Sequence, residues 1–495
     1  MLLFLGCSML SVYALMAWTA AGIGERSAAV LRSILPHFLH PTIGRWENGF
    51  ARFYDLPNSA VPIGTFLALL AAAFVLYVAA VHVIAPSVKR RIRRRSGYDD
   101  IPVVVKSRDR SDSLKLILVF GVAFRLVLFP TPLILENDLY RYLWEGKVAA
   151  AGISPYAHAP REALCDPCET DVGLRLSGLR SESSQSEAVF GRIGRKDVPA
   201  VYPPVSMGFF SLVAAIRPDS ELAMKGLIFG FDVATMILLA VILKAMNRPP
   251  GAVLIYAWSP LVIKEFANSG HLDAIGIFFL MLAFWFWIRR SRFGVIAGWT
   301  GSILSKYFAV VLAPIFWRRI GVTGLIAAGI VSVLSFVPFL LMDTGGMAGI
   351  SNTFSGFVTF GREWKFNAGL FRIIEFVVGT PTAKFIVTAV ILGLMALLAR
   401  NRFDSPRRAA QAVLILLFAS LALSPIVNPW YVTWIVPFLC LTISPAMLAL
   451  TALVNVSYTG FIDSREILCL TALEWGIVLL LVIREIRRWR YLFGP

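Results

Sequence analysis

Long runs of apolar residues, separated by short polar loops, fill most of the chain. Many of these runs approach or exceed the ~20 residues that a helix needs to cross a bilayer, and together they predict about 12–14 crossings. A β-barrel would show short alternating segments instead, so the pattern predicts an all-α polytopic membrane protein. The clearest predicted helices cover residues 2–22, 60–86, 113–134, 222–245, 250–266, 271–288, 320–342, 381–400, 407–424, 430–442, 444–462 and 468–484.

Three apolar segments do not fit a simple crossing. Residues 205–216 would span only ~18 Å as a helix, so this segment is predicted to be interfacial or re-entrant. The segment 293–317 has basic residues at both ends and Lys306-Tyr307 in its middle. We favour a broken hairpin that returns to the same side, and the alternative is a crossing with one basic end exposed outside. Residues 367–379 form a short apolar piece after a Gly-rich loop.

Composition supports the membrane assignment, and the placement of charge gives an orientation. The 495 residues have a mean hydropathy of +0.72, and only 16% are charged. A net charge of +17 could suggest nucleic acid, but the basic residues lie in short loops between apolar runs, as the positive-inside rule describes. No nucleic-acid partner is therefore expected. The basic clusters are Lys89 to Arg95, Arg289-Arg290, Arg318-Arg319, Arg407-Arg408 and Arg487-Arg488.

This orientation divides the chain into two parts. Residues 1–112 form an N-terminal extension of two helices and a basic cytoplasmic loop, and residues 113–495 form the main membrane domain. The start of the chain, up to Cys7, faintly suggests a lipoprotein signal, but it lacks a basic n-region, so we expect an uncleaved helix. Residues 135–205 form a long outer loop with a Ser-rich middle, and loops of this length predict function or local disorder.

The cysteines are assigned structural roles. Cys7, Cys440 and Cys469 lie in apolar runs and are expected to behave as small buried hydrophobes. Cys165 and Cys168 form a CDPC pair in the outer loop, where an oxidising environment would allow a local disulfide. A lone CxxC is weak evidence for a metal or redox site.

Polar and ionisable residues gather at the predicted outer ends of the helices. Because charge is costly to bury in a membrane, such groups usually mark a functional site. They predict one outward-facing cavity for a polar, anionic ligand, in which Arg and Lys contact phosphate. The groups are Asp138-Leu-Tyr140-Arg141, Tyr202-Pro-Pro204, Asn268-Ser-Gly-His271-Leu-Asp273, Lys306-Tyr307, Arg362-Glu-Trp-Lys365-Phe-Asn367 and Ser424-Pro-Ile-Val-Asn-Pro-Trp-Tyr431.

Each group also has a structural alternative. His271 and Asp273 could open a helix, with Asn268 or Ser269 as its N-cap. The aromatic residues of 135–160 and 428–431 could form an interfacial belt or a turn. Lys306 has fewer such explanations, because a lysine inside an apolar segment must snorkel, pair or face water.

The residue types suggest transfer chemistry at the membrane surface. Asp138 could act as a general base that removes a proton from an acceptor hydroxyl. Nearby Arg and Lys could stabilise a leaving lipid phosphate. The sequence has no Cys- or His-rich metal motif, no Gly-rich nucleotide loop and no Ser-His-Asp signature. We therefore expect neither a metal nor a cofactor.

Seven motifs in order resemble the bacterial GT-C fold glycosyltransferases, which are polyprenyl-phosphate-mannose-dependent mannosyltransferases and their relatives. The similarity covers about residues 113–445. The motifs are Asn137 to Gly146, Ala151 to Tyr156, Val201 to Pro204, Lys264 to Asp273, Lys306-Tyr307, Phe366 to Phe371 and Ser424 to Tyr431.

The resemblance implies a GT-C fold and a set of site roles. Asp138 would be the general base, while Arg141, His271 and Lys306 would contact the donor phosphate or sugar. The other substrate-binding residues implied are Tyr140, Tyr202, Asp273, Tyr307, Asn367 and Tyr431. One departure is Asn137, which stands where the family often has an acidic residue, so a second carboxylate would have to be Glu136.

The resulting hypothesis is an inverting hexosyltransferase, with mannose as the favoured sugar, in the bacterial inner membrane and with its active site on the extracytoplasmic side. The expected partners are a polyprenyl-phosphate-sugar donor, a glycan, glycolipid or other hydroxyl acceptor, and membrane lipids. The alternative is a transporter or flippase of a lipid-linked sugar. A transporter would not need Asp138 as a base, and it commonly shows internal repeats, which are not visible here.

Overall fold

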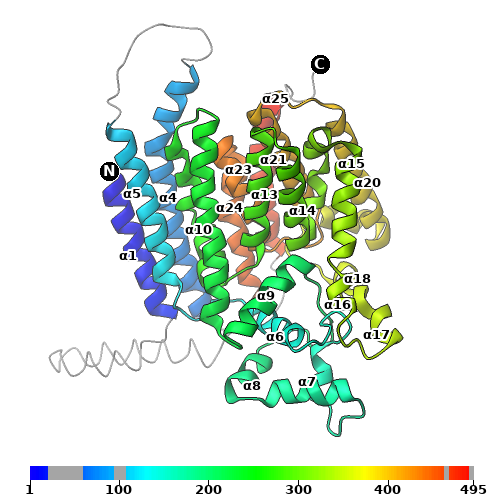
Figure 1. The fold of residues 1–495 in the computed structure, drawn as a ribbon. Helices are drawn as coiled ribbons and strands as arrows, with labels where there is room; N and C mark the ends of the chain where they lie inside the picture. Colours follow the sequence, from blue (N-terminus) through cyan, green and yellow to red (C-terminus); the bar gives the residue numbers. More distant parts are fainter. Residues whose placement is uncertain (21–59, 94–107, 462–467, 490–495) are drawn as a thin grey trace, which may run out of the picture.

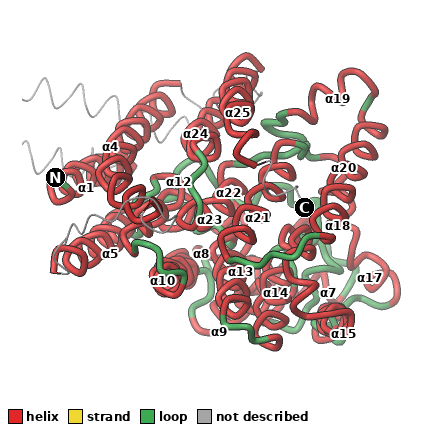
Figure 2. Tube along the Cα trace, turned by 90° about the horizontal axis from the view of Figure 1, so that it is seen from above, coloured by secondary structure: helices red, strands yellow, loops and turns green. Residues whose placement is uncertain are grey.

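A computed structural model describes residues 1–20, 60–93, 108–461 and 468–489, and within these ranges the protein is helical, without β-strands. The helices stand roughly side by side, with a group of shorter helices at one end (Figure 1). Viewed from above, α1 (Leu2–Ala20), α4 (Ala60–Arg93) and α5 (Arg108–Leu128) lie at one side, and α20 (Thr380–Arg400) lies at the other (Figure 2). The predicted segment 23–59 lies outside the described residues.

Five helical stretches among the described residues are long and apolar enough to cross a membrane, which confirms the all-α membrane class. Fewer helices meet this criterion than the about 12–14 predicted crossings, because several predicted crossings are broken and others form helices of fewer than 18 residues. The five stretches are Leu2–Ala20, Gly64–Ile84, Glu221–Ala245, Tyr307–Leu340 and Thr380–Arg400.

The breaks follow from proline and from changes of helix type. The predicted crossing 250–266 consists of η3 (Pro250–Val253), α11 (Leu254–Ala257), α12 (Pro260–Val262) and the π-helical η4 (Ile263–Asn268). Segment 430–442 contains α22 (Pro429–Val432), η7 (Thr433–Ile435) and α23 (Val436–Leu441), and 444–462 contains α24 (Pro445–Leu453) and η8 (Val454–Phe461). Pro250, Pro260 and Pro429 each stand at a first helical position, where a missing N–H costs least.

The predicted hairpin at 293–317 is present. α14 (Arg292–Ser305) ends at the extended Lys306, and the chain then returns through η5 (Tyr307–Leu312) into α15 (Ala313–Leu334). Arg319 lies over the Trp287 ring at 5.3 Å, so the far end of the hairpin returns to the end of α13 (Asp273–Ile288). Gly321, with φ 69° and ψ 177°, then breaks the apolar stretch 307–340.

Helix α10 (Glu221–Ala245) shows how far apart the two ends of the bundle are. Its 25 residues span ~37 Å. At its start Glu221 pairs with Arg192 of the 135–205 segment, and beyond its end Arg248 donates to the carbonyl of Leu441 (3.0 Å). We call these the loop end and the basic end. Arg407 lies near Arg248 at the basic end. The far end of the hairpin lies at the same end of the bundle and adds Arg290, Arg318, Arg319 and Arg400.

The loop end is built largely from the 135–205 segment, which is more ordered than its length suggested. It forms α6 (Asp138–Ala150), η2 (Pro160–Leu164), α7 (Asp171–Ser181) and α8 (Ser184–Gly191), before α9 (Pro204–Ile216). The Ser-rich middle is helical, because Thr170 and Ser183 cap α7 and α8 with their side chains. Cys165 and Cys168 form a disulfide in this segment.

The remaining helices complete the bundle and its loop end. Three short helices lie at the lower right of Figure 1, namely α16 (Val337–Leu340), α17 (Met347–Ser351) and α18 (Ser355–Glu363). The short η6 (Asn352–Phe354) connects α17 to α18. They are followed by α19 (Leu370–Val378), α20, α21 (Pro406–Ala422) and, after α24 and η8, α25 (Leu468–Trp489).

Candidate functional site

Asp138 is the first residue of α6, at the loop end. The predicted helix 113–134 ends earlier, at Leu128, because Pro130 and Pro132 cannot continue it. The turn that follows delivers Asp138 to the α6 N-terminus, where the helix dipole favours a negative charge. Its side chain is 32% exposed, so the carboxylate is open to an incoming ligand.

Asn268 fixes this turn against the bundle. Its side-chain oxygen accepts from the backbone N–H of Ile134 (3.0 Å), and its Nδ2 donates to Thr131 Oγ1 (2.8 Å) and to the carbonyl of Pro132 (2.7 Å). Asn268 therefore does not cap a helix, and the N-cap of α13 is Leu272, without a side-chain bond. This corrects the capping alternative for Asn268.

His271 lies beside Asp138 and is fully buried. Its Nδ1 is 3.9 Å from Asp138 Oδ2, and its Nε2 is 3.3 Å from Glu265 Oε2. The ring stacks on Trp430, with centroids 4.0 Å apart and an angle of 13° between the planes. Although it was predicted to contact the donor, the imidazole faces two protein carboxylates.

Asp273 and Lys306 form a close ion pair. The Lys306 ammonium is 2.7 Å from each Asp273 oxygen, and Trp434 Nε1 donates to Oδ1 at 2.6 Å. The ammonium also lies 4.3 Å from the centre of the Tyr431 ring. Asp273 is buried and the Lys306 side chain is 18% exposed, so the lysine forms the accessible side of the pair. Lys306 therefore pairs, which was one of the expected outcomes for an intramembrane lysine.

Tyrosine side chains connect these groups into one site. Asp138, Asp273 and Glu136 all lie within electrostatic range of the Tyr431 hydroxyl. Burial, followed by the nearby Asp138 and Glu145 carboxylates, raises the pKa of Tyr202 well above its usual range. Tyr202 packs edge-on against Tyr142 of α6, with centroids 5.0 Å apart. Six predicted residues therefore meet at the loop end, namely Asp138, Tyr202, His271, Asp273, Lys306 and Tyr431.

Arg141 lies within electrostatic range of Asp138, but its guanidinium is largely taken up by the protein. Its Nε donates to Glu145 Oε1 (2.6 Å), and its Nη atoms donate to the carbonyls of Arg195 (3.0 Å), Val198 and Pro199 (2.9 Å). Its predicted phosphate contact remains a prediction, whereas its contacts show that it holds the 195–199 loop on α6. Burial raises the pKa of Glu145 to about 7, although Arg141 opposes the shift.

Three further predicted residues lie away from this group. The Tyr140 hydroxyl accepts from Arg192 (2.8 Å), so this ring points toward α10 and the outer loop. Tyr307 packs on Phe357 of α18, with centroids 5.1 Å apart.

Asn367 is buried, and its Nδ2 donates to Glu474 of α25 (3.2 Å to each oxygen) and to the carbonyl of Val427 (3.4 Å). Because Phe366 and Ile426 also form a backbone bridge, Asn367 braces the loop that leads to Tyr431.

Several buried polar residues at the site were not among the predicted ones. Glu265 accepts from the Tyr458 hydroxyl (2.6 Å) and pairs with Lys264 (3.3 Å), and all three side chains are buried. Adjacent opposite charges in an apolar run, at Lys264-Glu265, were the signal that could have found them. Nothing in the sequence pattern distinguished Tyr458 or Trp434. Glu136, which the resemblance implied as a second carboxylate, lies within electrostatic range of Asp138 and Lys264, and burial raises its pKa, with Lys264 opposing the shift.

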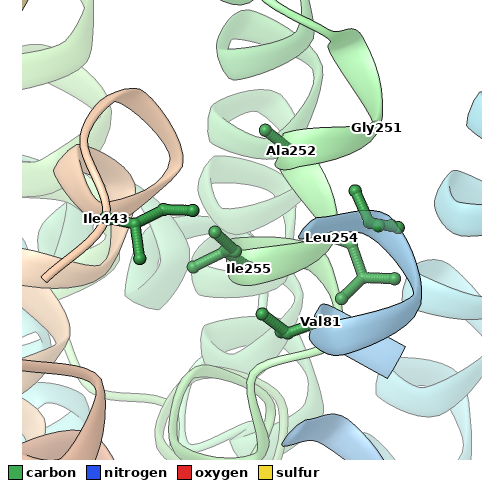
Figure 3. A pocket seen from close by; sticks show the side chains of 7 residues that line it. Val81, Gly251, Ala252, Leu254, Ile255 and Ile443 are labelled. Carbon is green, nitrogen blue, oxygen red and sulfur yellow. The ribbon is translucent and has the colours of Figure 1, made fainter. Parts of the chain in front are cut away.

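A small pocket lies away from the site. Figure 3 shows a small pocket of purely aliphatic lining, with no polar side chain that could act on a ligand. It lies between α4 and the η3–α11 segment, just after Arg248, and therefore near the basic end. Its lining residues are Val81, Ile84, Gly251, Ala252, Leu254, Ile255 and Ile443. Separately, no group of three or more His, Cys, Asp or Glu side chains in the described ranges could hold a metal ion.

Comparison with known proteins identifies the family. Residues 65–320 match the MptA_B family, described as alpha-(1->6)-mannopyranosyltransferase, N-terminal domain. The match begins within α4, before the motifs that start at Asn137, and ends before Asn367 and Tyr431. No curated protein and no solved structure matches the chain. Because the matched region covers just over half of the chain and contains Asp138, His271, Asp273 and Lys306, the protein belongs to this family of mannosyltransferases.

Proposed function

We propose that the protein transfers a hexose, mannose by preference, from a polyprenyl-phosphate carrier to a hydroxyl acceptor, with inversion at the sugar. The acceptor would be a glycolipid or polysaccharide. One observation carries the proposal: a partly exposed carboxylate, Asp138, and the Asp273–Lys306 pair lie around the same tyrosine, Tyr431, at the loop end. The GT-C resemblance of the same motifs supports the choice of donor.

In this reaction the acceptor oxygen attacks C1 of the sugar from the side opposite to the phosphate. The bond from C1 to the phosphate oxygen breaks, its electron pair leaves with the polyprenyl phosphate, and Asp138 accepts the acceptor's proton. An ammonium has three N–H donors. Two of those of Lys306 meet Asp273, so one remains for a phosphate oxygen. Such a contact would stabilise the charge that develops on the leaving group.

The separation of the two ends supports an extracytoplasmic site in a bacterial inner membrane. The positive-inside rule favours the cytoplasmic side for the arginines of the basic end. The candidate site lies at the loop end, ~37 Å away along α10. The proposed partners are therefore the lipid-linked donor, the acceptor and the surrounding lipids.

The decisive experiment is sugar transfer by purified wild type and Asp138→Asn in liposomes. The donor is radiolabelled polyprenyl-phosphate mannose, and a membrane-lipid extract supplies the acceptor. Loss of a general base typically lowers the rate by about 10²–10⁴-fold. The matched control is Asp197→Asn, which removes an exposed carboxylate of the same outer segment and should leave transfer unchanged. Labelled lipid that crosses the bilayer without transfer would instead support the flippase alternative.

The proposed chemistry needs no metal, because a lysine can neutralise a monophosphate leaving group. We predict that prolonged treatment with EDTA leaves transfer intact. The measurement is the initial rate before and after chelation. Activity that disappears with EDTA and returns only with an added divalent cation would contradict the metal-free chemistry.

A further inference from the structure

His271 is held between two carboxylates that belong to different parts of the chain. Asp138, at the start of α6, lies 3.9 Å from Nδ1, and Glu265, in the π-helical η4, lies 3.3 Å from Nε2. Neither ring nitrogen makes a hydrogen bond of good geometry within the described protein. Catalytic hydrogen bonds are often long before the substrate binds and tighten in the complex.

The protein holds the ring firmly in this position. Trp430 stacks on one face of the imidazole, and the backbone N–H of His271 donates to the carbonyl of Glu265 (3.0 Å). Gly270 has a φ of +66°, and a Cβ there would lie 2.8 Å from Leu139 Cδ1, so a glycine allows α6 to approach this closely. π-helical turns frequently occur at functional sites.

Glu265 dictates which nitrogen carries hydrogen. Its carboxylate accepts from the Tyr458 hydroxyl (2.6 Å) and pairs with the Lys264 ammonium (3.3 Å), and both contacts favour the ionised form. A carboxylate accepts hydrogen bonds only, and Glu265 Oε2 lies within hydrogen-bond distance of Nε2 (3.3 Å), whereas Asp138 Oδ2 is too far from Nδ1 (3.9 Å) to accept one. The single hydrogen of the neutral ring therefore belongs on Nε2. In the neutral ring Nδ1 is then left with its lone pair directed toward Asp138.

Several other charged and titratable side chains surround Asp138 and His271. In addition to Glu265 and Tyr458 they are Glu136, Arg141, Tyr142, Glu145, Tyr202, Lys264, Asp273 and Tyr431. The two basic side chains of this set each form an ion pair: Arg141 pairs with Glu145, and Lys264 pairs with Glu265. His271 is the group of the set that directly links Asp138 to a second carboxylate.

We propose that His271 acts through Asp138. Asp138 removes the proton from the acceptor hydroxyl, and His271 then takes this proton from Asp138. This inference rests on the proposed function of Asp138. The acceptor oxygen forms its bond to C1, the phosphate leaves with the electron pair, and the proton passes to Asp138 and then to His271 Nδ1. The resulting imidazolium lies between two carboxylates, and Asp138 returns to its ionised form. When the products leave, the proton returns through the exposed edge of Asp138 to water.

This role differs from the donor contact implied by the family resemblance. His271 is fully buried, and both nitrogens face protein carboxylates, so the ring is not presented to a ligand. Loss of His271 should therefore lower kcat and leave the KM for the donor nearly unchanged. A donor contact would instead change KM.

The first test compares His271→Gln, Glu265→Gln and Asp138→Asn in the liposome transfer assay over pH 5–9. We expect kcat to fall about 10²-fold in His271→Gln, with the donor KM within about twofold. An imidazole takes up a proton at higher pH than a carboxylate, so the acid limb of the kcat profile should move to lower pH in this variant. Because the residues act as a unit, adding His271→Gln to Asp138→Asn should cost little more.

The outcomes separate this inference from the proposed function. If Asp138→Asn retains transfer, the general base is wrongly assigned and both proposals fall. If Asp138→Asn is inactive while folded His271→Gln keeps the wild-type kcat and pH profile, only the inference about His271 is wrong. An unchanged kcat and an increased donor KM in His271→Gln would show a donor contact instead.

A second measurement does not depend on a His271 variant that folds. The chain has five histidines, so replacing the other four by Gln leaves a single imidazole for ¹⁵N NMR. In the pH range in which the ring is neutral, the expected spectrum shows hydrogen on Nε2. A neutral ring with hydrogen on Nδ1 would overturn the proposal, because such a nitrogen has no lone pair for the proton of Asp138.

Discussion

At the residue scale, the site depends on the pairing of the buried Asp273 carboxylate with the Lys306 ammonium. Asp273 is buried at the start of α13, and its carboxylate is met by Lys306 and by Trp434 Nε1. Removing one partner of a buried pair is far more destabilising than replacing both, because one uncompensated charge remains.

We therefore predict that Lys306→Met lowers the free energy of unfolding by about 3–5 kcal/mol and abolishes transfer. The double variant Lys306→Met/Asp273→Asn should regain most of the stability and no activity. Thermal unfolding in detergent and the transfer assay measure the two effects. Lys365→Met is the control, because its exposed pair with Glu375 should contribute under about 1 kcal/mol. Active Lys306→Met would show that this lysine has no role in transfer.

The buried carboxyl group of Glu145 should make the free energy of unfolding depend on pH. Burial raises its pKa to about 7 in the folded protein, from an ordinary value of 4.5. The folded state then binds the proton more tightly, so this contribution to stability is complete below about pH 4.5 and is lost as the pH rises to about 7. The loss amounts to about 3 kcal/mol.

Unfolding of Glu145→Gln over pH 5–8 should therefore show a flatter pH dependence than that of wild type. Glu187→Gln, at an exposed position of α8, is the control and should follow the wild-type curve. A Glu145→Gln curve parallel to wild type would show that Glu145 is ionised throughout this range.

The sequence identified the chemical groups of the site better than their partners. Asp138, His271, Asp273 and Lys306 stood out because ionisable residues are rare in apolar surroundings. The partners of Arg141 could not be predicted, because three of its four acceptors are backbone carbonyls, which every sequence offers. Tyr140 was grouped with Arg141 by proximity in sequence, although neighbouring helical residues point in different directions.

At the element scale, the crossing of α6 and α9 positions Asp138. Gly146 lies where the two helices approach most closely, and a Cβ there would be 2.5 Å from the carbonyl oxygen of Phe210 and 2.6 Å from its carbon. These are backbone atoms, so the helices would have to separate. In contrast, Gly208 of α9 has nothing within 4 Å of a Cβ built on it.

We predict that Gly146→Ala reduces transfer at least tenfold and destabilises the protein by about 1–3 kcal/mol, as expected for overpacking. Gly208→Ala should preserve activity and raise stability by up to about 1 kcal/mol, because alanine is the better helix former. Transfer and thermal unfolding of both variants test the crossing. Equal behaviour of the two variants would show that the close approach at Gly146 is not needed.

The sequence predicted where helices lie better than where they break. Apolar length found nearly every described helix of the bundle, because hydrophobic runs respond to the bilayer thickness. The π-helical turn at Ile263–Asn268 and the reversal at Gly321 arise from local backbone geometry, which carries no apolar signal. Similarly, the helices of the 135–205 segment were hidden by a serine-rich composition, although Thr170 and Ser183 proved to be caps.

At the scale of the whole molecule, the two ends of the bundle differ in chemistry. The arginines of the basic end lie near one another, whereas arginines of the loop end, such as Arg141, Arg175 and Arg195, pair with carboxylates. The basic loops between the helices meet at one end, and the side of the membrane that this end faces stays a prediction. The predicted boundary between residues 1–112 and 113–495 stays a prediction. The two parts are in contact, because the Tyr77 hydroxyl of α4 donates to the carbonyl of Ile255 (2.8 Å) in the main domain.

We predict that a single cysteine at Ser184 reacts with a membrane-impermeant maleimide added to intact spheroplasts, and that one at Asp404 does not. Both positions are exposed, at the loop end and in the loop between α20 and α21, respectively. The variants are made in a background without Cys7, Cys440 and Cys469. Inverted vesicles provide the reciprocal control, in which only the Asp404 position should react. The opposite labelling would place the candidate site in the cytoplasm.

Arg141 anchors the 195–199 loop through the main chain of the loop. Because its guanidinium binds the main-chain oxygens of residues 195, 198 and 199, the loop is recognised by its path and not by its side chains. For the contacts of Arg141, the identity of the side chains along this loop therefore matters less than the course of the backbone. Insertion or deletion of a single residue would shift all three oxygens at once. A change in the length of this loop should therefore disturb the anchorage at Arg141 more than a change of its side chains.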